Sequence, residues 1–225
     1  TAYRRQRQMC IRDRGYIEAR PAVDKERVYI GTWGAMFYAI DRKDGKKVWE
    51  FDTKRGRYFS PGACWPVVLP YTEQNKKAEQ VIVLSSDYFV RAFQPGNGEI
   101  IWASDEAKGR ESLGFSPDGK TMYVKGIKNT ITAVDIAHGK YHSLWSTVMP
   151  YESNFIPTRM ETTGQLVFIP TEFGVLYAVK ADGSGIAWSH KISHSAITSL
   201  KNAGKGKVIV MTMDGTVSCL KYTDK

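Results

Sequence analysis

Residues 39–49 read AIDRKDGKKVW: a short apolar stretch, a polar turn with a glycine, and a second stretch that ends in tryptophan. The same order recurs at residues 92–102, 133–145 and 178–188, with the tryptophan ten, ten, twelve and ten residues after the alanine across the four copies. Each alanine lies eleven residues after the start of an apolar triplet, and a fifth triplet at Val208 precedes Cys219 by the same distance. A pattern that recurs five times in one chain indicates a repeat architecture.

Each repeat unit predicts four antiparallel strands joined by tight, glycine-bearing turns. The triplet, the alanine stretch and the tryptophan stretch supply three of these strands. The remaining strand, which is the first of each unit, is expected just before each triplet, at residues 17–23, 65–69, 112–116, 156–162 and 197–201. Four strands in about 43 residues are typical of a β-propeller blade. The predicted fold class is therefore all-β, a partial β-propeller of about four to five four-stranded blades from a larger propeller.

The blades are expected at roughly 15–52, 53–105, 106–148, 149–191 and 192–225, so that 15–225 forms one propeller fragment. The fifth unit ends after its third strand. We therefore expect the closing strand, and sequence upstream of this chain, to lie outside the sequence given.

The repeat also predicts which residues hold neighbouring blades together. The small residue lets two sheets approach closely, and the tryptophan is expected to cover the seam between them. The structural anchors are Ala39, Asp41, Gly45, Trp49, Ala92, Gly98, Trp102, Ala133, Asp135, Gly139, Trp145, Ala178 and Trp188.

The first residues do not fit the repeat. Residues 4–14, RRQRQMCIRDR, resemble a translated transposase-type sequencing adapter, so residues 1–14 are expected to be non-native and disordered. Without residues 4–14 the formal net charge of +9 falls to about +5, with lysines spread over the turns. This distribution favours a solvated surface, and no nucleic-acid partner is expected. No apolar run is long enough to cross a bilayer.

The pattern Ala-x-Asp-x-x-x-Gly-x-x-x-Trp resembles the repeat of PQQ-like β-propellers, the quinoprotein alcohol dehydrogenase-like and BamB-like family. Residues 39–49 match it at every key place, whereas Gln94 and Lys180 replace the aspartate in two other copies. The resemblance implies a non-catalytic binding or scaffold module of a bacterial extracytoplasmic protein, periplasmic or secreted. One alternative is the accessory propeller of a secreted calcineurin-like metallophosphoesterase whose catalytic domain is absent. A second is a fragment of a quinone-dependent dehydrogenase.

The resemblance to quinone enzymes carries expectations about cofactors. Those enzymes use a tryptophan platform, calcium ligands and often a vicinal disulfide, but Cys10, Cys64 and Cys219 are far apart in this sequence. We therefore expect no PQQ, no metal and no catalytic residue.

The best candidate site is formed by the loops that follow the tryptophan strands, because such loops surround one mouth of a propeller channel. These loops are rich in arginine and aromatic residues, which suit a protein or peptide partner. The candidate residues are Arg57, Tyr58, Trp65, Arg110, Glu111, Asn154, Phe155 and His194. A second apolar patch is expected at Trp33, Met36 and Phe37.

Overall fold

The computed structural model describes residues 16–54, 64–151 and 157–223, and every regular element in these ranges is a β-strand. The strands form five antiparallel sheets, which we call blades 1 to 5. Blade 1 contains β1 (Ala22–Val23), β2 (Arg27–Gly31), β3 (Met36–Asp41) and β4 (Lys47–Asp52). Blade 2 contains β5 (Val67–Glu73), β6 (Lys76–Leu84), β7 (Val90–Phe93) and β8 (Ile100–Ser104). Blade 3 contains β9 (Gly109–Phe115), β10 (Thr121–Gly126), β11 (Thr130–Asp135) and β12 (His142–Val148).

Blade 4 contains β13 (Glu161–Thr162), β14 (Leu166–Pro170), β15 (Val175–Lys180) and β16 (Ile186–Lys191). Blade 5 contains β17 (Ile197–Gly204), β18 (Lys207–Thr212) and β19 (Val217–Lys221). Within every blade, neighbours in the sheet are neighbours in the sequence. The predicted all-β architecture of four-stranded blades is thus confirmed.

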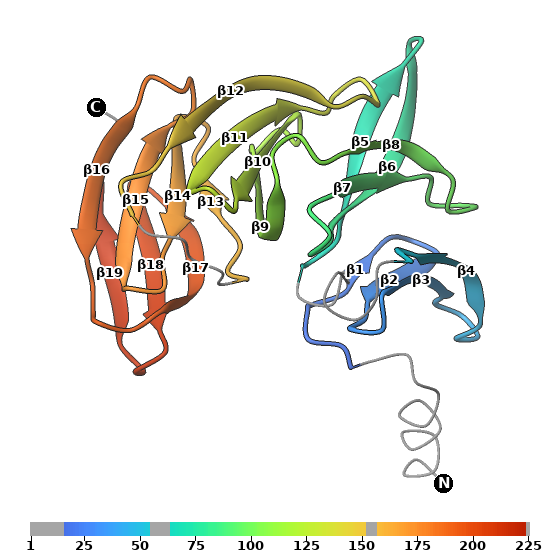
Figure 1. The fold of residues 1–225 in the computed structure, drawn as a ribbon, viewed down its shortest axis with the longest axis horizontal. Coiled ribbons are helices and arrows are strands. Elements are labelled where there is room, and N and C mark those ends of the chain that lie inside the picture. The colour runs from blue at the N-terminus through green and yellow to red at the C-terminus, as the bar shows by residue number, and fades with distance from the viewer. Residues whose placement is uncertain (1–15, 55–63, 152–156, 224–225) are drawn as a thin grey trace, which may run out of the picture.

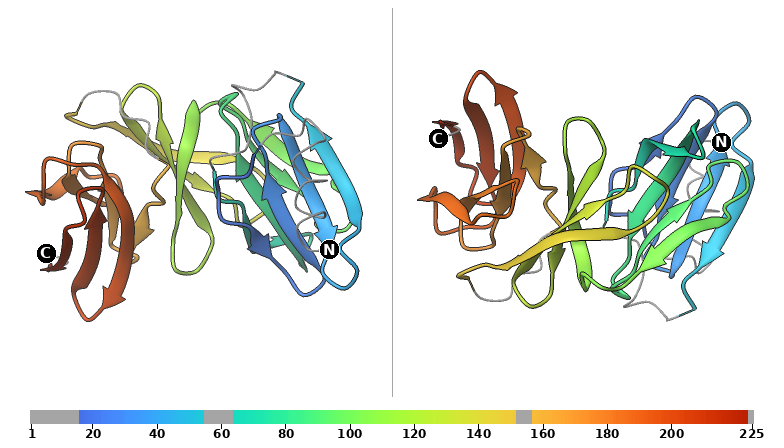
Figure 2. Two further views of the ribbon diagram at one scale, coloured as in Figure 1. Left: turned by 90° about the horizontal axis from the view of Figure 1, so that it is seen from below. Right: turned by 90° about the horizontal axis from the view of Figure 1, so that it is seen from above.

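The blades follow one another along an open arc, from β1–β4 to β17–β19 (Figure 1). Two further views place the first and last blades at opposite ends of the molecule (Figure 2). The described part of the chain is therefore a partial propeller whose ring does not close.

The conserved spacing of the repeat corresponds to one cross-strand register. In each four-stranded blade the small residue of the third strand lies opposite the tryptophan of the fourth. The register then shifts by one residue directly after the alanine, as it does between Ala39 and Ile40. Such a β-bulge increases the local twist of a strand. The pairs are Ala39 with Trp49, Ala92 with Trp102, Ala133 with Trp145 and Ala178 with Trp188.

The core consists of four apolar clusters, one between each pair of successive blades. In blades 1 to 4 the middle residue of each triplet faces the next blade and is at most 3% exposed. These residues are Tyr29, Ile82, Tyr123 and Phe168. Because a four-stranded sheet has two apolar faces, each blade can bury both only between two neighbours.

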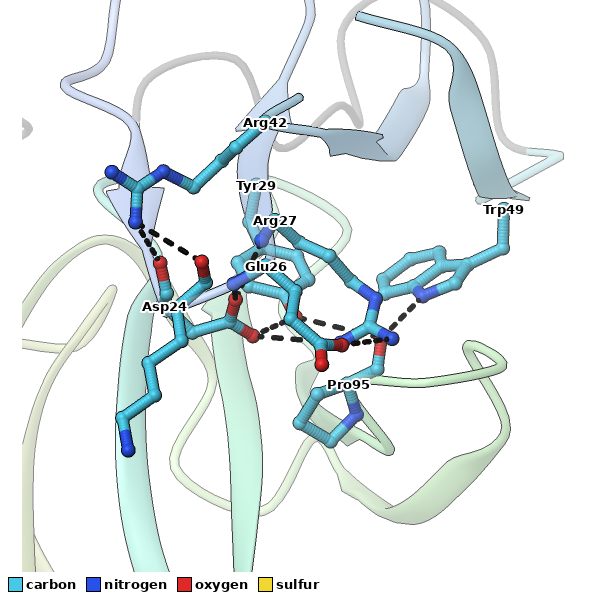
Figure 3. A network of polar contacts seen from close by, with 8 residues as sticks. Asp24, Glu26, Arg27, Tyr29, Arg42, Trp49 and Pro95 are labelled. Atoms are coloured by element: carbon cyan, nitrogen blue, oxygen red, sulfur yellow. Dashed lines mark hydrogen bonds and ion pairs between the residues drawn. The ribbon is translucent and has the colours of Figure 1, made fainter. Parts of the chain in front are cut away.

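The tryptophan joins its own blade to the next one. Trp49 Nε1 donates to the carbonyl oxygen of Pro95 at 2.8 Å, and Trp145 Nε1 donates to that of Ala181 at 3.0 Å. Both acceptors lie three residues after the small residue of the next blade. The first bond is drawn in Figure 3. A Cβ at Gly98 or Gly183 would lie 2.6 Å from the indole of Trp49 or Trp145. The turn glycine is therefore the surface on which the indole packs.

The seam between blades 2 and 3 uses a different set of side chains. Trp102 Nε1 donates to Gln80 Oε1 at 3.0 Å, and Gln80 Nε2 donates to the carbonyl of Ile136 at 2.9 Å. The Tyr71 ring occupies the place over Gly139 that an indole takes elsewhere. The turn of blade 3 is two residues longer than the others, and the fully buried Gln80 links Trp102 to the start of this turn.

The seam between blades 4 and 5 lacks this bond. Trp188 Nε1 is buried and has no acceptor among the described residues. The indole packs against Phe168, with ring centroids 5.8 Å apart. This seam therefore has the aromatic packing of the other seams but not the indole hydrogen bond.

A polar network supports the start of blade 1 (Figure 3). The Asp24 carboxylate accepts hydrogen bonds from the Tyr29 hydroxyl at 2.6 Å and from the backbone amides of Glu26 at 2.7 Å and Arg27 at 2.6 Å. Burial acts to raise the pKa of Asp24, but these hydrogen bonds outweigh burial and hold the pKa below its usual value. The charged form of Asp24 is therefore the one that the fold stabilises.

This network predicts an acid-sensitive contribution to stability. A carboxyl group whose pKa is lowered by folding contributes fully above its unfolded pKa of about 4, and the contribution is lost as pH falls through the lower folded pKa. Asp24→Asn should therefore be less stable than the wild type at pH 7 and close to it at pH 2. Melting temperatures measured from pH 7 to 2 would check this, and two parallel curves would contradict it.

Candidate binding face

Two kinds of connection meet at one end of the blades. Successive strands run in opposite directions, so the turns between second and third strands share an end with the connections from one blade to the next. Backbone hydrogen bonds join them: Thr53 N donates to Ala35 O at 2.9 Å, and Met213 N donates to Ala196 O at 2.8 Å. We call this end the loop face. It comprises residues 32–35, 85–89, 127–129, 171–174 and 213–216 together with the described parts of the inter-blade connections.

The opposite end, which we call the turn face, is closed by polar side chains. Asp41 Oδ1 accepts from the amide of Lys43 at 2.7 Å, and Asp182 Oδ1 accepts from that of Ser184 at 2.8 Å. These hydrogen bonds hold the pKa of Asp182 below its usual value. Short turns of this type satisfy their own backbone and leave few groups for a partner.

The loop face instead exposes large apolar side chains. Phe173 is 45% exposed and Met213 is 71% exposed, each in the turn between the second and third strands of its blade. Val148, the last residue of β12, is 72% exposed. Isolated exposed apolar residues are ordinary, but a group of them at one end of a molecule is typical of an interaction surface.

The structure describes three of the predicted mouth side chains. Trp65 is 36% exposed, His194 is exposed in the connection between blades 4 and 5, and Arg110 is half-buried near the start of β9. Glu111 also lies in β9, but its side chain is outside the described part of the structure. Four predicted residues lie outside the described ranges: Arg57, Tyr58, Asn154 and Phe155. Their gathering at one channel mouth therefore stays a prediction.

Trp65 belongs to a narrow pocket formed by three blades. It lies beside Cys64, the inner strand β9 of blade 3 and residues that precede β13 of blade 4. Among these, the Arg159 guanidinium lies over the Phe115 ring at 5.4 Å. Sequence reasoning missed Arg159 because it lies within residues 156–162, which were predicted only as a strand. Its position adds a cation to the aromatic residues of this pocket.

A buried lysine lies below the loop face between blades 3 and 4. Lys125 is 5% exposed, donates to the carbonyl of Pro170 at 3.1 Å and lies 5.6 Å from the centroid of the Tyr151 ring. The Tyr151 hydroxyl and Asn129 Oδ1 are buried without a partner among the described residues. Burial, and to a lesser degree the neighbouring Tyr177, raises the pKa of Tyr151 well above its usual value. Tyr151 is therefore a neutral hydrogen-bond donor.

The second predicted patch is wrong in one residue. Trp33 is half-buried, and its indole nitrogen donates to Glu18 Oε2 at 2.9 Å. Phe37 is fully buried and contacts Trp49 and Phe93 in the core between blades 1 and 2. Alternation along β3 points Phe37 inward, which a turn assignment could not reveal.

Two observations on the described residues concern a metal ion and the repeat tryptophans. They contain no group of three or more His, Cys, Asp or Glu side chains that could hold a metal ion. The four repeat tryptophans lie in outer strands, where they pack on neighbouring side chains or turns. In the part of the chain that the structure describes, no helix is long and apolar enough to span a membrane.

Comparison with known proteins places these features in a family. A family model described as outer membrane protein assembly factor BamB matches residues 8–140, more than half of the chain. The chain belongs to this BamB-like family of PQQ-repeat propellers. The predicted family resemblance is thus confirmed, while the interpretation of residues 4–14 as an adapter lies outside the described residues.

Two relatives show what the chain shares with larger proteins. The crystal structure of BamB from Moraxella catarrhalis superimposes with a TM-score of 0.71 and 17% identity, and the match covers 92% of this chain and 59% of that one. At this identity the likeness concerns the fold. The quinohemoprotein alcohol dehydrogenase ADH-IIG of Pseudomonas putida is 28% identical over an alignment of 187 residues, and the match covers 78% of this chain and 25% of the dehydrogenase. The chain therefore spans only part of each relative.

Proposed function

We propose that this chain is a non-catalytic scaffold module that binds a protein partner through its loop face in a bacterial extracytoplasmic compartment. The observation that carries the proposal is the contrast between the turns at the two ends of the blades. The loop face exposes Phe173, Met213 and Trp65, whereas aspartate side chains cap the turns of the opposite end. Membership of a family described as an outer membrane assembly factor supports a role in protein assembly.

The chemistry of the loop face suits a protein surface. Aromatic and arginine side chains dominate the binding energy of protein interfaces, and buried contacts are strongest where an apolar centre is surrounded by polar groups. Phe173 and Met213 supply apolar contact area. Arg159 and His194, which lie in the connections that lead into blades 4 and 5, supply polar groups. The packed seams hold these residues on a rigid support.

A test compares two positions of blade 4 that have similar exposed fractions and lie at opposite ends of the blade. A photoreactive benzoylphenylalanine replaces either Phe173 on the loop face or Ile186 near the turn face, which are 45% and 41% exposed. The labelled chains are irradiated with a bacterial extracytoplasmic extract. A discrete crosslinked protein is expected from position 173 and none from position 186. The double substitution Arg57→Ala and Trp65→Ala should remove the product.

Equal labelling from both positions, or no discrete product from position 173, would refute a specific loop-face partner. A product from position 186 alone would locate the interface at the wrong end of the blades.

The alcohol dehydrogenase relative favours one second candidate, a fragment of a quinone-dependent dehydrogenase. That function requires PQQ and calcium to bind the intact parent protein. Reconstitution of the intact parent protein with PQQ and calcium, followed by absorbance spectroscopy, tests it, and we expect no bound quinone. No observation among the described residues favours the metallophosphoesterase alternative.

A further inference from the structure

A narrow pocket near the middle of the arc holds an arginine that has no anionic partner among the described residues. The pocket lies where three blades meet, and its walls are formed by Cys64, Trp65, Leu113, Phe115, Pro157 and Arg159. These residues lie in blade 3 or directly before the first strands of blades 2 and 4. Each of these three blades has a neighbouring blade on both sides (Figure 1). The pocket is therefore independent of the ends of the chain.

Arg159 is the single charged residue in the pocket wall. Its guanidinium lies over the Phe115 ring, with Cζ 5.4 Å from the ring centroid. The side chain is half-buried, and no described residue forms an ion pair or a hydrogen bond with the guanidinium. Because a guanidinium carries five N–H donors and no acceptor, Arg159 is equipped to bind an anion.

The closest described acidic residue in the sequence does not neutralise this charge. Glu161 instead accepts hydrogen bonds from Lys201 Nζ at 3.3 Å and from the backbone amide of Asn202 at 3.2 Å. The Glu161 carboxylate therefore belongs to the seam between blades 4 and 5. Within the described ranges, the positive charge of Arg159 remains unbalanced.

The backbone on both sides of Arg159 is fixed to blade 3. The carbonyl oxygen of Thr158 accepts from Ser112 Oγ at 2.5 Å. The backbone amide of Met160 donates to the carbonyl oxygen of Leu113 at 3.0 Å. A guanidinium that rests on an aromatic ring and a fixed backbone has less freedom to lose on binding than a mobile surface arginine. The site is therefore preorganised.

The size and lining of the pocket select the kind of anion. The enclosed space is about 10 Å³, close to the least that holds one water molecule. An oxygen of a carboxylate fits this space, whereas a phosphate group or a ring is too large unless the walls move. The other walls, including Trp65 and Phe115, are mainly apolar. Charge-assisted hydrogen bonds are stronger in such surroundings than in water.

We infer that the pocket at Arg159 binds a carboxylate side chain of the protein partner, an inference that rests on the proposed protein-binding function. The carboxylate accepts hydrogen bonds from the Arg159 guanidinium. Trp65, which is 36% exposed, offers the rest of its ring to an apolar residue next to the acidic one. The partner segment is thus an acidic residue flanked by apolar residues.

Four probes separate the sources of such an anion. The peptide acetyl-Gly-Leu-Glu-Leu-Gly-amide carries one side-chain carboxylate, and its Gln analogue carries none. The Gln peptide with a free C-terminus carries a terminal carboxylate, and the fourth probe is inorganic phosphate. Each probe is titrated into the isotope-labelled full chain at constant ionic strength, because salt screens ion pairs. NMR follows the Nε–Hε signal of Arg159 and the indole N–H signal of Trp65.

A saturable shift of both signals is expected with the Glu peptide. Its affinity should be at least tenfold higher than that of the Gln peptide, since the neutral amide cannot form the ion pair. The free-terminus peptide and phosphate should bind more weakly than the Glu peptide, because neither presents a side-chain carboxylate between apolar residues.

Variants of the chain locate the binding site. Arg159→Gln should weaken binding of the Glu peptide about tenfold or more. Arg159→Lys should retain part of the affinity, because lysine keeps the charge but not the planar fork of donors. Lys43→Gln is the matched control, since it removes one positive charge from an exposed position on the turn face and should leave the affinity unchanged. The Tm of each variant distinguishes lost binding from unfolding.

Several results would overturn the inference. Equal affinities of the Glu and Gln peptides would do so, as would an unchanged affinity of Arg159→Gln for the Glu peptide. Tighter binding of the free-terminus peptide would assign the pocket to a chain terminus. Phosphate binding as tight as that of the Glu peptide would make the pocket a general anion site.

Crosslinking from position 173 in the Arg159→Gln background separates this inference from the proposed function. The yield of the crosslinked product is expected to fall. An unchanged yield would overturn the role of the pocket and leave the loop-face partner in place. Binding of the Glu peptide at Arg159 without any crosslink from position 173 would refute that partner and support the carboxylate pocket alone.

Discussion

Replacing Trp49 by alanine should lower the free energy of unfolding by about 3–5 kcal/mol, the usual cost of removing a large buried aromatic side chain. Trp49 is 7% exposed and packs against Tyr29, Phe37 and Phe93, with ring centroids 5.6–5.9 Å apart. Its indole also donates to Pro95 in the next blade. The substitution therefore removes both the apolar and the polar part of one seam, and urea unfolding measures the loss.

A pair of milder substitutions separates the two parts. Trp49→Phe leaves the Pro95 carbonyl without its donor and should cost about 2–3 kcal/mol. Trp188→Phe removes an indole that has no acceptor and should cost about 1 kcal/mol less than that. Equal losses for the two phenylalanine variants would show that the inter-blade hydrogen bond contributes nothing measurable.

Replacing Gly183 by alanine should also have a large effect, about 3 kcal/mol or more, because two costs combine. Gly183 has φ of +80°, which disfavours any residue with a Cβ, and a Cβ there would lie 2.6 Å from the Trp145 indole. The turn would have to move away from the ring and would weaken the seam between blades 3 and 4.

Gly45→Ala is the matched control for this substitution. Gly45 has φ of +71°, but a Cβ there would meet nothing within 4 Å. The control should therefore show only the backbone cost of about 1 kcal/mol. If thermal or urea unfolding gave the same loss for both alanine variants, contact between the glycine turn and the indole would not support the seam.

The repeat made most of the fold predictable. Alanine and tryptophan ten residues apart placed the third and fourth strands, because a hairpin register fixes which residues lie opposite each other. Apolar triplets placed the second strands, since a short continuous apolar run is typical of a strand that is buried on both faces. The local spacing within one unit thus carried the information, and its recurrence in four units, with two extra residues in the third, made it unambiguous.

Apart from the tryptophan at each seam, contacts between units were not predictable. Gln80 directly precedes an apolar triplet, but its side chain bonds to Trp102, 22 positions away, and to Ile136, 56 positions away in the chain. Phe37 was predicted at the surface because it lies close to a turn. The prediction did not consider which face of β3 the side chain occupies, and this face is buried. Arg159 and the pocket at Trp65 depend on the curvature of the arc, which no single unit encodes.

Indole hydrogen bonds at the seams between successive blades are the central feature of this fold. Hydrogen exchange of the indole N–H groups, followed by NMR, tests them directly. We predict slow exchange for Trp49, Trp102 and Trp145, whose donors have acceptors at 2.8–3.0 Å, and faster exchange for Trp188, which has none. Fast exchange at all four indoles, or protection of Trp188 equal to that of the other three, would contradict the claim that these hydrogen bonds hold the seams.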